Sequence, residues 1–229
     1  MKIYAVIVAG GSGSRMGSIT PKQFLNVLGK PLLHHTLRAF IEAFADVHII
    51  LVLPADNLAA GEELARQSGA THPVRVTAGG TSRFLSVKAG LQFVEPDSIT
   101  LVHDGVRCLV TPALIRHCCQ VAIEKGNAIP AISSTDSMRM EINGYYEQVD
   151  RNTLKLIQTP QAFKSELLKA AYDNAAGGDF TDESGVTEAW GVRINLVEGE
   201  SENIKITRPV DLPLAELILK TRLENKTTG

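Results

Sequence analysis

Residues 3–17 read IYAVIVAGGSGSRMG, an apolar run of strand length followed at once by a glycine-rich turn. The run 3–9 is apolar throughout, which is typical of a strand buried on both faces. Buried strands of this kind belong to parallel sheets that helices cover on both sides. The stretch therefore favours an α/β fold with a ligand-binding loop at the carboxyl end of its first strand.

Further apolar runs of the same length recur along the chain, and helical patterns separate them. Apolar residues recur at helical spacing within 33–44 and 84–94. The alternation predicts a three-layer, Rossmann-like α/β domain with a mostly parallel sheet and ligands at the carboxyl ends of its strands. The strand-length runs cover residues 3–9, 48–53, 74–77, 99–103, 128–132 and 193–197.

The alternation breaks in residues 133–156, which are polar, contain Gly144 and two tyrosines, and alternate weakly with period 2. The pattern fits a protruding β-hairpin arm and a surface loop equally well. Beyond it, the pattern 209–223 begins with a proline and predicts a last helix that closes the domain. A chain of 229 residues fits a single domain, 1–229.

The composition argues against several classes of protein. The formal net charge is -2, from 23 Lys and Arg against 25 Asp and Glu, so no basic field is available to bind nucleic acid. Aromatic residues make up only 5%, too few for base-stacking surfaces. No apolar run approaches the ~18 residues of a membrane span, so we expect no membrane segment, and no signal peptide. Three cysteines, an odd number, favour a reducing cytoplasm.

The glycine loop 10–17 matches neither of two common phosphate-binding motifs. A dinucleotide-binding fingerprint would need glycine where Met16 stands, and an ATPase P-loop would need Gly-Lys followed by Ser or Thr. Backbone N–H groups of glycines can still approach phosphate oxygens, and two cations, Arg15 and Lys22, accompany the loop. We interpret it as a triphosphate cradle; the alternative is a tight turn with solvated charges.

The order of short motifs along the chain resembles one enzyme family. GSGSRMG at 11–17 with PKQF at 21–24 resembles the signature of sugar-phosphate nucleotidyltransferases, and specifically of the 2-C-methyl-D-erythritol 4-phosphate cytidylyltransferase family. The ribitol 5-phosphate cytidylyltransferases share PKQF and QTPQ with it and are the nearest alternative. The further motifs, in order, are GGTSR at 79–83, VHDGVR at 102–107, VDRN at 149–152, QTPQ at 158–161, TDE at 181–183 and ENIKITRP at 202–209.

The resemblance implies a nucleotidyltransferase that transfers CMP from CTP to 2-C-methyl-D-erythritol 4-phosphate and releases pyrophosphate, in the non-mevalonate isoprenoid pathway. Its catalytic cations would be Arg15, Lys22 and Lys205, since negative charge spreads over the phosphates during transfer. Asp104, just past the strand 99–103, would hold Mg²⁺, an ion that prefers oxygen ligands. From the residue type alone, a cap of a turn is an equal alternative for Asp104.

The resemblance also assigns residues to each substrate. Lys205 lies on an expected short strand, 203–207, and without the match it would be taken for an exposed strand lysine. His103 is expected to be structural, because no partner stands at zinc-ligand spacing. The CTP-binding residues would be Ala9, Gly10, Gly11, Gly13, Gly80, Thr81, Ser86, Asp104 and Gly105. The alditol phosphate would be bound by Arg107 and Thr159 and, from the arm of a partner subunit, by Ser137 and Arg151.

The same resemblance implies a homodimer joined through the arm 133–156. A protein of another class, a noncatalytic nucleotide-binding scaffold, stays open because fold does not determine function. Such a scaffold would have no need for several cations and a carboxylate around one loop, so the sequence favours an enzyme. These residues are Arg15, Lys22, Asp104 and Lys205.

Overall fold

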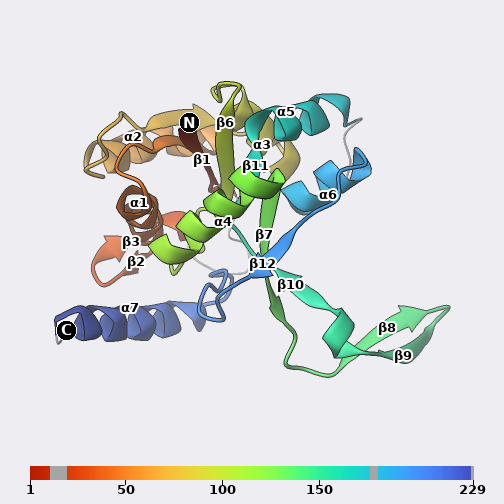
Figure 1. Cartoon of the computed structure of the whole chain (residues 1–229). Coiled ribbons are helices and arrows are strands. Elements are labelled where there is room, and N and C mark those ends of the chain that lie inside the picture. Colours follow the sequence, from red (N-terminus) through yellow and green to blue (C-terminus); the bar gives the residue numbers. More distant parts are fainter. Residues whose placement is uncertain (11–19, 176–179, 228–229) are drawn as a thin grey trace.

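A mixed, mostly parallel sheet forms the middle layer of the protein, and helices cover both of its faces (Figure 1). The structure is a computed structural model and describes residues 1–10, 20–175 and 180–227. Within these residues the elements are, in chain order, β1 Lys2–Val8, η2 Lys22–Phe24, β2 Asn26–Val27, β3 Lys30–Pro31, α1 Leu32–Ala43, β4 His48–Leu53, η3 Ala55–Asn57, α2 Leu58–Arg66, β5 Arg75–Ala78, α3 Arg83–Leu91, β6 Ser98–Asp104, α4 Pro112–Lys125, β7 Asn127–Ser133, β8 Met138–Ile142, β9 Tyr145–Val149, η4 Arg151–Thr153, β10 Lys155–Ile157, β11 Gln161–Lys164, α5 Ser165–Asn174, α6 Glu183–Ala189, β12 Leu196–Glu198 and α7 Asp211–Thr227.

The main sheet has the strand order β10-β7-β11-β6-β1-β4-β5, with β12 beside β7. Strands β6, β1, β4 and β5 run parallel, and Val8 at the end of β1 lies opposite Asp104 and Val52. β11 runs antiparallel to β6 and β7, and β10 runs antiparallel to β7. The six predicted strands are therefore confirmed, the last as the shorter β12, whereas β10 and β11 were not predicted.

Residues of β1 pack alternately on the two faces of the sheet, as the pleat requires. Ala5 and Ile7 join the apolar cluster formed with α1 and α4. Tyr4, Val6 and Val8 join the opposite cluster, formed with α3, α5 and α6. Burial on both faces explains why this strand is apolar throughout. The same packing holds β1 in place, and the glycine loop follows the end of this strand in the sequence.

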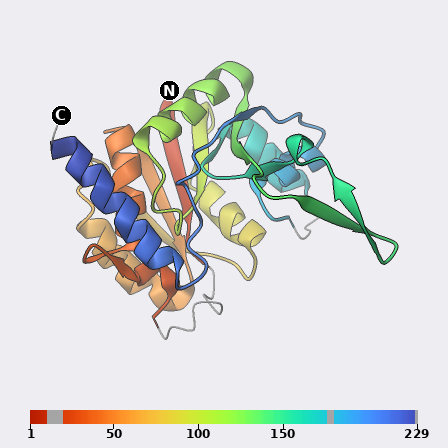
Figure 2. The same ribbon diagram turned by 90° about the horizontal axis from the view of Figure 1, so that it is seen from below.

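Strands β8 and β9 form an antiparallel hairpin that projects away from the main sheet (Figure 1, Figure 2). Asn143 and Gly144 at its tip have positive φ values of 53° and 84°. Asn-Gly favours this conformation and the two-residue hairpin turn that needs it. The hairpin expected within 133–156 is thus confirmed, while its role as a dimerisation arm stays a prediction.

The last helix, α7, confirms the helix predicted at 209–223 and packs on a third, smaller apolar cluster that includes Val27, Ile206 and Ala215. The expected strand at 203–207 is wrong, because these residues form no strand. Ile206 N in this segment donates a hydrogen bond to Val106 O at 3.1 Å. This bond does not belong to a ladder of strand pairs. None of the described helices is long and apolar enough to cross a membrane.

Candidate active site

The carboxyl ends of β1, β5 and β6 meet at one edge of the sheet. Main-chain bonds tie this edge together: Ala9 N donates to Val52 O at 2.9 Å, and Gly105 N donates to Val8 O at 2.8 Å. A cavity of about 380 Å³ opens there. It is lined by Val8, Ala9, Gly10, Lys22, Gln23, Gly80, Thr81, Ser82, Arg83, Ser86, Asp104, Val106 and Lys205.

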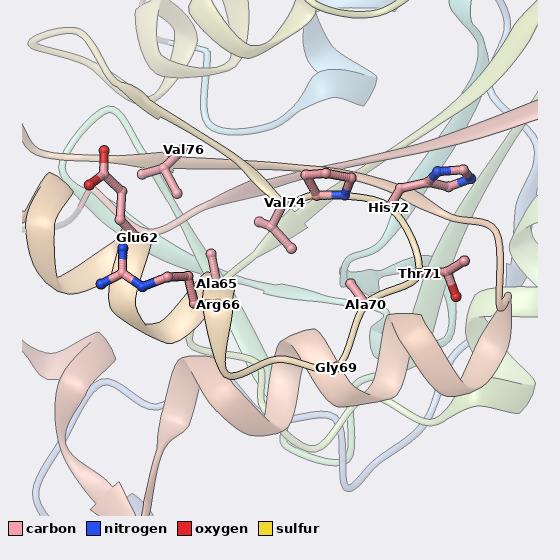
Figure 3. Close-up of a pocket in the computed structure, with 10 residues that line it drawn as sticks. Glu62, Ala65, Arg66, Gly69, Ala70, Thr71, His72, Val74 and Val76 are labelled. Carbon is pink, nitrogen blue, oxygen red and sulfur yellow. The ribbon is translucent and has the colours of Figure 1, made fainter.

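A larger cavity, of about 450 Å³, lies elsewhere, between α2 and the loop that precedes β5 (Figure 3). Of the described residues that line it, none was assigned to a substrate from the motifs. Its charged side chains Glu62 and Arg66 lie at one end and His72 at the other, so they do not converge on one point (Figure 3). Open parallel sheets bind ligands at the carboxyl ends of their strands, and we therefore place the site in the smaller cavity.

The loop 79–82 is folded tightly onto the start of α3. The Ser82 hydroxyl caps this helix by accepting a hydrogen bond from Leu85 N at 3.1 Å. Ser86 Oγ donates to Ser82 O at 2.8 Å and accepts from Gly80 N at 3.2 Å. A Cβ atom on Gly80 would lie 2.4 Å from Leu85 Cβ, so the loop can approach the helix only because this residue is glycine.

Asp104 is buried at the end of β6 and faces three cations. Its Oδ2 lies 3.0 Å from Lys205 Nζ and 3.5 Å from Arg107 Nε, and its Oδ1 lies 3.3 Å from Arg83 Nε. Burial alone would raise the pKa of Asp104, but the cations, led by Arg83, hold that pKa well below its ordinary value. The carboxylate is therefore ionised and sits within a cluster of net positive charge.

Arg83 and Asn203 are among the residues of this edge that sequence reasoning did not assign. Arg83 is the last residue of the GGTSR motif and the first residue of α3. Its position directly after the loop at the carboxyl edge of the sheet could have identified it as a site residue. Asn203 has no exposed surface, and its Nδ2 donates to Thr159 O at 2.8 Å. Its carbonyl accepts from Arg107 Nη1 at 2.8 Å. Burial lowers the pKa of this arginine from its ordinary value.

The residues assigned from the motifs separate into groups. Gly105, Arg107 and Thr159 lie directly behind the cavity: a Cβ on Gly105 would lie 2.8 Å from Ala9 Cβ, and Thr159 Oγ1 accepts from Asp104 N at 3.1 Å. The assigned residues that line the cavity itself are Ala9, Gly10, Lys22, Gly80, Thr81, Ser86, Asp104 and Lys205.

Five of the assigned residues are not found at this edge: two lie elsewhere in the chain, and three lie outside the described residues. Ser137 and Arg151 are exposed at the base of the hairpin, where Arg151 Nη1 donates to Thr135 O at 2.8 Å. Neither is among the residues that line the cavity. Gly11, Gly13 and Arg15 lie outside the described residues, so their assignments stay predictions.

Comparison with known proteins decides the family. A profile of the 2-C-methyl-D-erythritol 4-phosphate cytidylyltransferase family matches residues 3–221. The chain belongs to this family. It is 45% identical over 219 residues to the 2-C-methyl-D-erythritol 4-phosphate cytidylyltransferase of Bacteroides thetaiotaomicron, covering 96% of this chain and 100% of the relative. It is 44% identical over 215 residues to the protein of the same name from Bacteroides fragilis, covering 94% and 98%.

Solved structures agree with this membership of the cytidylyltransferase family. The 4-diphosphocytidyl-2C-methyl-D-erythritol synthase of Anaerococcus prevotii aligns with a TM-score of 0.82 at 30% identity, over 96% of each chain. The 2-C-methyl-D-erythritol 4-phosphate cytidylyltransferase of Thermus thermophilus aligns with a TM-score of 0.74 at 30% identity, over 94% of this chain and 98% of that one. The chain is therefore an enzyme of the nucleotidyltransferase class, and the α/β nucleotidyltransferase fold expected from its sequence is confirmed.

Proposed function

We propose that the cavity at the carboxyl edge of the sheet transfers CMP from CTP to 2-C-methyl-D-erythritol 4-phosphate. A phosphate oxygen of the alditol phosphate attacks the α-phosphorus of CTP, the bond from that phosphorus to the bridging oxygen of the β-phosphate breaks, and pyrophosphate leaves. The other product is 4-CDP-2-C-methyl-D-erythritol, an intermediate of isoprenoid synthesis. The proposal is carried by the convergence of Lys22, Asp104 and Lys205 on one cavity in a member of this family.

The reaction requires cations, because its two anionic substrates repel each other and negative charge grows on the leaving pyrophosphate. Lys22 and Lys205 line the cavity from separate segments of the chain. We assign Lys22 to the triphosphate and Lys205 to the α-phosphate. Arg15 is also assigned to the triphosphate, because it belongs to the glycine-loop motif. The attacking oxygen belongs to the second substrate, so the protein itself has no need to form a covalent intermediate.

We assign cytosine and ribose to the loops beside the cavity. Gly80 and Thr81 lie on one loop, and Ala9 and Gly10 lie on the other. The Ser86 hydroxyl is engaged in bracing the loop 79–82. We therefore expect the loop's backbone groups, which glycine leaves uncovered, to supply the polar contacts with the base.

The donor set fits a magnesium ion that is shared with substrate phosphates. Mg²⁺ is usually held by one or two carboxylates together with phosphate oxygens, and Asp104 supplies one ionised carboxylate. Within the described residues, no group of three or more Asp, Glu, His or Cys side chains could hold an ion without substrate. We assign the ion to Asp104; when bound, it would neutralise part of the charge on the triphosphate. Lys205, whose side chain is 40% exposed, is the partner of Asp104 with most room to move.

We assign the alditol phosphate to Arg107 of one subunit and to Ser137 and Arg151 of a partner subunit in a homodimer. Arginine suits a phosphate monoester because its planar guanidinium donates two parallel hydrogen bonds. The projecting hairpin supports dimerisation, since Tyr145 and Tyr146 are 77% and 67% exposed and a two-stranded hairpin is marginally stable alone. The protein would act in the cytoplasm, where its three buried free cysteines stay reduced.

A pyrophosphate-release assay tests the proposed function. The protein is given CTP and Mg²⁺ with either 2-C-methyl-D-erythritol 4-phosphate or ribitol 5-phosphate. We expect turnover with the methylerythritol substrate, in keeping with the names of the relatives above. Turnover with the ribitol substrate alone would contradict the proposed substrate, and no turnover with either would favour a noncatalytic nucleotide-binding protein.

A further inference from the structure

A chain of hydrogen bonds behind the cavity joins the backbone of Asp104 to the backbone of Arg107. Asp104 N donates to Thr159 Oγ1 at 3.1 Å, and Thr159 Oγ1 lies 3.0 Å from Nδ1 of His103. The other ring nitrogen of His103, Nε2, lies 3.2 Å from the carbonyl oxygen of Arg107. His103 has no exposed surface and Thr159 is 4% exposed, so water does not compete for these bonds.

Chemistry fixes the direction of every bond in this relay. A carbonyl oxygen only accepts, so the hydrogen between His103 and Arg107 belongs to His103 Nε2. Among the described residues, Nδ1 of His103 is the acceptor that the Thr159 hydroxyl meets, at 3.0 Å. Nδ1 must therefore accept the hydroxyl hydrogen of Thr159, while the oxygen of that hydroxyl accepts from Asp104 N.

Packing holds the ring in this orientation. The ring of Phe40 meets the His103 imidazole edge to face, with 5.2 Å between the ring centres. Phe40 belongs to α1, in the apolar layer beneath the sheet. The imidazole thus turns its polar edge toward Thr159 and Arg107, and both of its nitrogens are satisfied within the protein.

We propose that His103 is a positioning residue that sets the place of Asp104 on the nucleotide side and of Arg107 on the alditol phosphate side. The proposal rests on the proposed function, which gives those two residues their separate substrates. Because the Thr159 hydroxyl hydrogen is committed to His103, this hydroxyl acts through the relay on the main chain at Asp104.

The two branches of the relay reach different parts of the site. Through Thr159, His103 sets the main chain at Asp104, whose carboxylate faces Lys205 in the nucleotide cavity. Through its Nε2, His103 sets the main chain at Arg107, whose side chain is held by the carbonyl of Asn203. Loss of one branch should therefore affect one substrate more than the other.

Two substitutions at position 103 separate the branches. His103→Gln keeps an amide N–H near the position of Nε2 but removes the acceptor for Thr159. His103→Asn keeps an oxygen near the position of Nδ1 but removes the donor to Arg107. We expect His103→Gln to raise the Kd for CTP roughly tenfold and His103→Asn to raise the KM for the alditol phosphate roughly tenfold, because each leaves one buried group unpaired. Each variant should leave the other substrate within about threefold of the wild type.

Thr159→Val tests the Thr159 branch independently and should reproduce the CTP effect of His103→Gln. Combined with His103→Gln, it should add little, because both substitutions break the same branch. If either histidine variant fails to fold, this comparison of Thr159→Val with the wild type still decides the point. A rise in KM for the alditol phosphate with no change in the Kd for CTP would instead show that the Thr159 hydroxyl binds the substrate directly, and would overturn the proposal.

Thr100→Val is the matched structural control. Thr100 lies on the same strand, is fully buried, and its hydroxyl bonds to Ser165 Oγ at 2.7 Å, away from the cavity. It should lower the melting temperature without changing the Kd for CTP or the KM for the alditol phosphate. If both His103 variants weaken the two substrates equally and only in proportion to a lower melting temperature, His103 has a merely structural role.

The readouts also separate this inference from the proposed function. The Kd for CTP is measured by calorimetry and needs no turnover. A wild-type protein that binds CTP but turns over neither alditol phosphate would contradict the proposed function, and the CTP affinities of His103→Gln and Thr159→Val would still test the Thr159 branch.

Discussion

Both terminal nitrogens of the Arg83 guanidinium donate to the two carboxylate oxygens of Glu183, a side chain with no exposed surface. Tyr172 donates a further hydrogen bond to the same carboxylate at 3.2 Å. Burial by itself would lower the pKa of Arg83, but Glu183 and then Asp104 raise it above its ordinary value. Arg83 thus stays charged while it bridges α6 and the Asp104 carboxylate.

Glu183→Gln should destabilise the fold, because it leaves the Arg83 charge buried with only one remaining carboxylate. Breaking a buried ion pair in this way costs about 3–5 kcal/mol of unfolding free energy. Urea denaturation measures the loss. Glu188→Gln is the matched control, since it removes the same charge from an exposed position of the same helix and should change stability by less than about 0.5 kcal/mol. Equal losses in the two variants would contradict the structural role of this pair.

Lys22→Ala should lower kcat by about two to three orders of magnitude while the protein stays folded, because it removes a cation from the developing pyrophosphate charge. Lys22 lines the cavity, whereas Lys30 is exposed and does not. Lys30→Ala is therefore the control for a lost lysine charge. The pyrophosphate-release assay and a melting curve check both variants, and a near-normal kcat for Lys22→Ala would show that the triphosphate lies elsewhere.

Several of the predicted strands differ from the missed ones in the length of their apolar runs. β1, β4 and β6 lie inside the sheet, so long apolar runs mark them in the sequence. β10 and β11 are short, and Pro160, a residue that normally interrupts strands, stands between them. Their pairing is set by the neighbouring strands β7 and β6 rather than by a pattern of their own.

The sequence motifs identified residues that line the cavity, but they did not identify the hydrogen bonds and ion pairs that hold the site together. Lys22, Asp104 and Lys205 were assigned from a resemblance and do line one cavity. The contact of Arg83 with Glu183 spans 100 positions in sequence, and the residue type alone cannot specify such a partner. His103 was correctly expected to be structural; its relay to Thr159 depended on burial and tautomer, which only the folded protein defines.

Arg151→Ala should chiefly impair use of the alditol phosphate and leave the Kd for CTP largely unchanged. The reason is its place on the hairpin segment, away from the residues that line the nucleotide cavity. Arg139→Ala removes an exposed arginine from β8 and is the control. A comparable loss of CTP affinity in Arg151→Ala would contradict the assignment.

Mixing Arg151→Ala with Lys22→Ala protein tests whether Arg151 acts across a dimer. In a mixed dimer, one site would combine both substitutions and the other would be wild type. With random exchange of equal amounts, activity should recover to about a quarter of the wild-type value, because half of the dimers carry one intact site of two. No recovery after subunit exchange, with the two variants each inactive, would show that Arg151 serves its own chain.

The free energy of unfolding should fall as the pH falls below about 6.5, and His103 should contribute to that fall. Burial lowers the pKa of His103 from 6.5 to about 3, so the unfolded chain binds a proton in this interval and the folded chain does not. The contribution is absent above pH 6.5 and grows by about 1.4 kcal/mol for each pH unit below it. Burial also lowers the pKa of His34 and His48, so the wild type alone cannot isolate the effect.

The difference between the wild type and His103→Gln isolates this contribution. Urea unfolding at several values between about pH 4.5 and 7 should give a wild-type curve that is steeper below pH 6.5 by about 1.4 kcal/mol per unit. Asp104 does not disturb the comparison, because its lowered pKa keeps it ionised in the folded protein, and its unfolded value of 3.8 lies below the interval. Parallel curves would mean that the ring takes up a proton in the folded protein, and the neutral tautomer on which the direction of the relay depends would then be wrong.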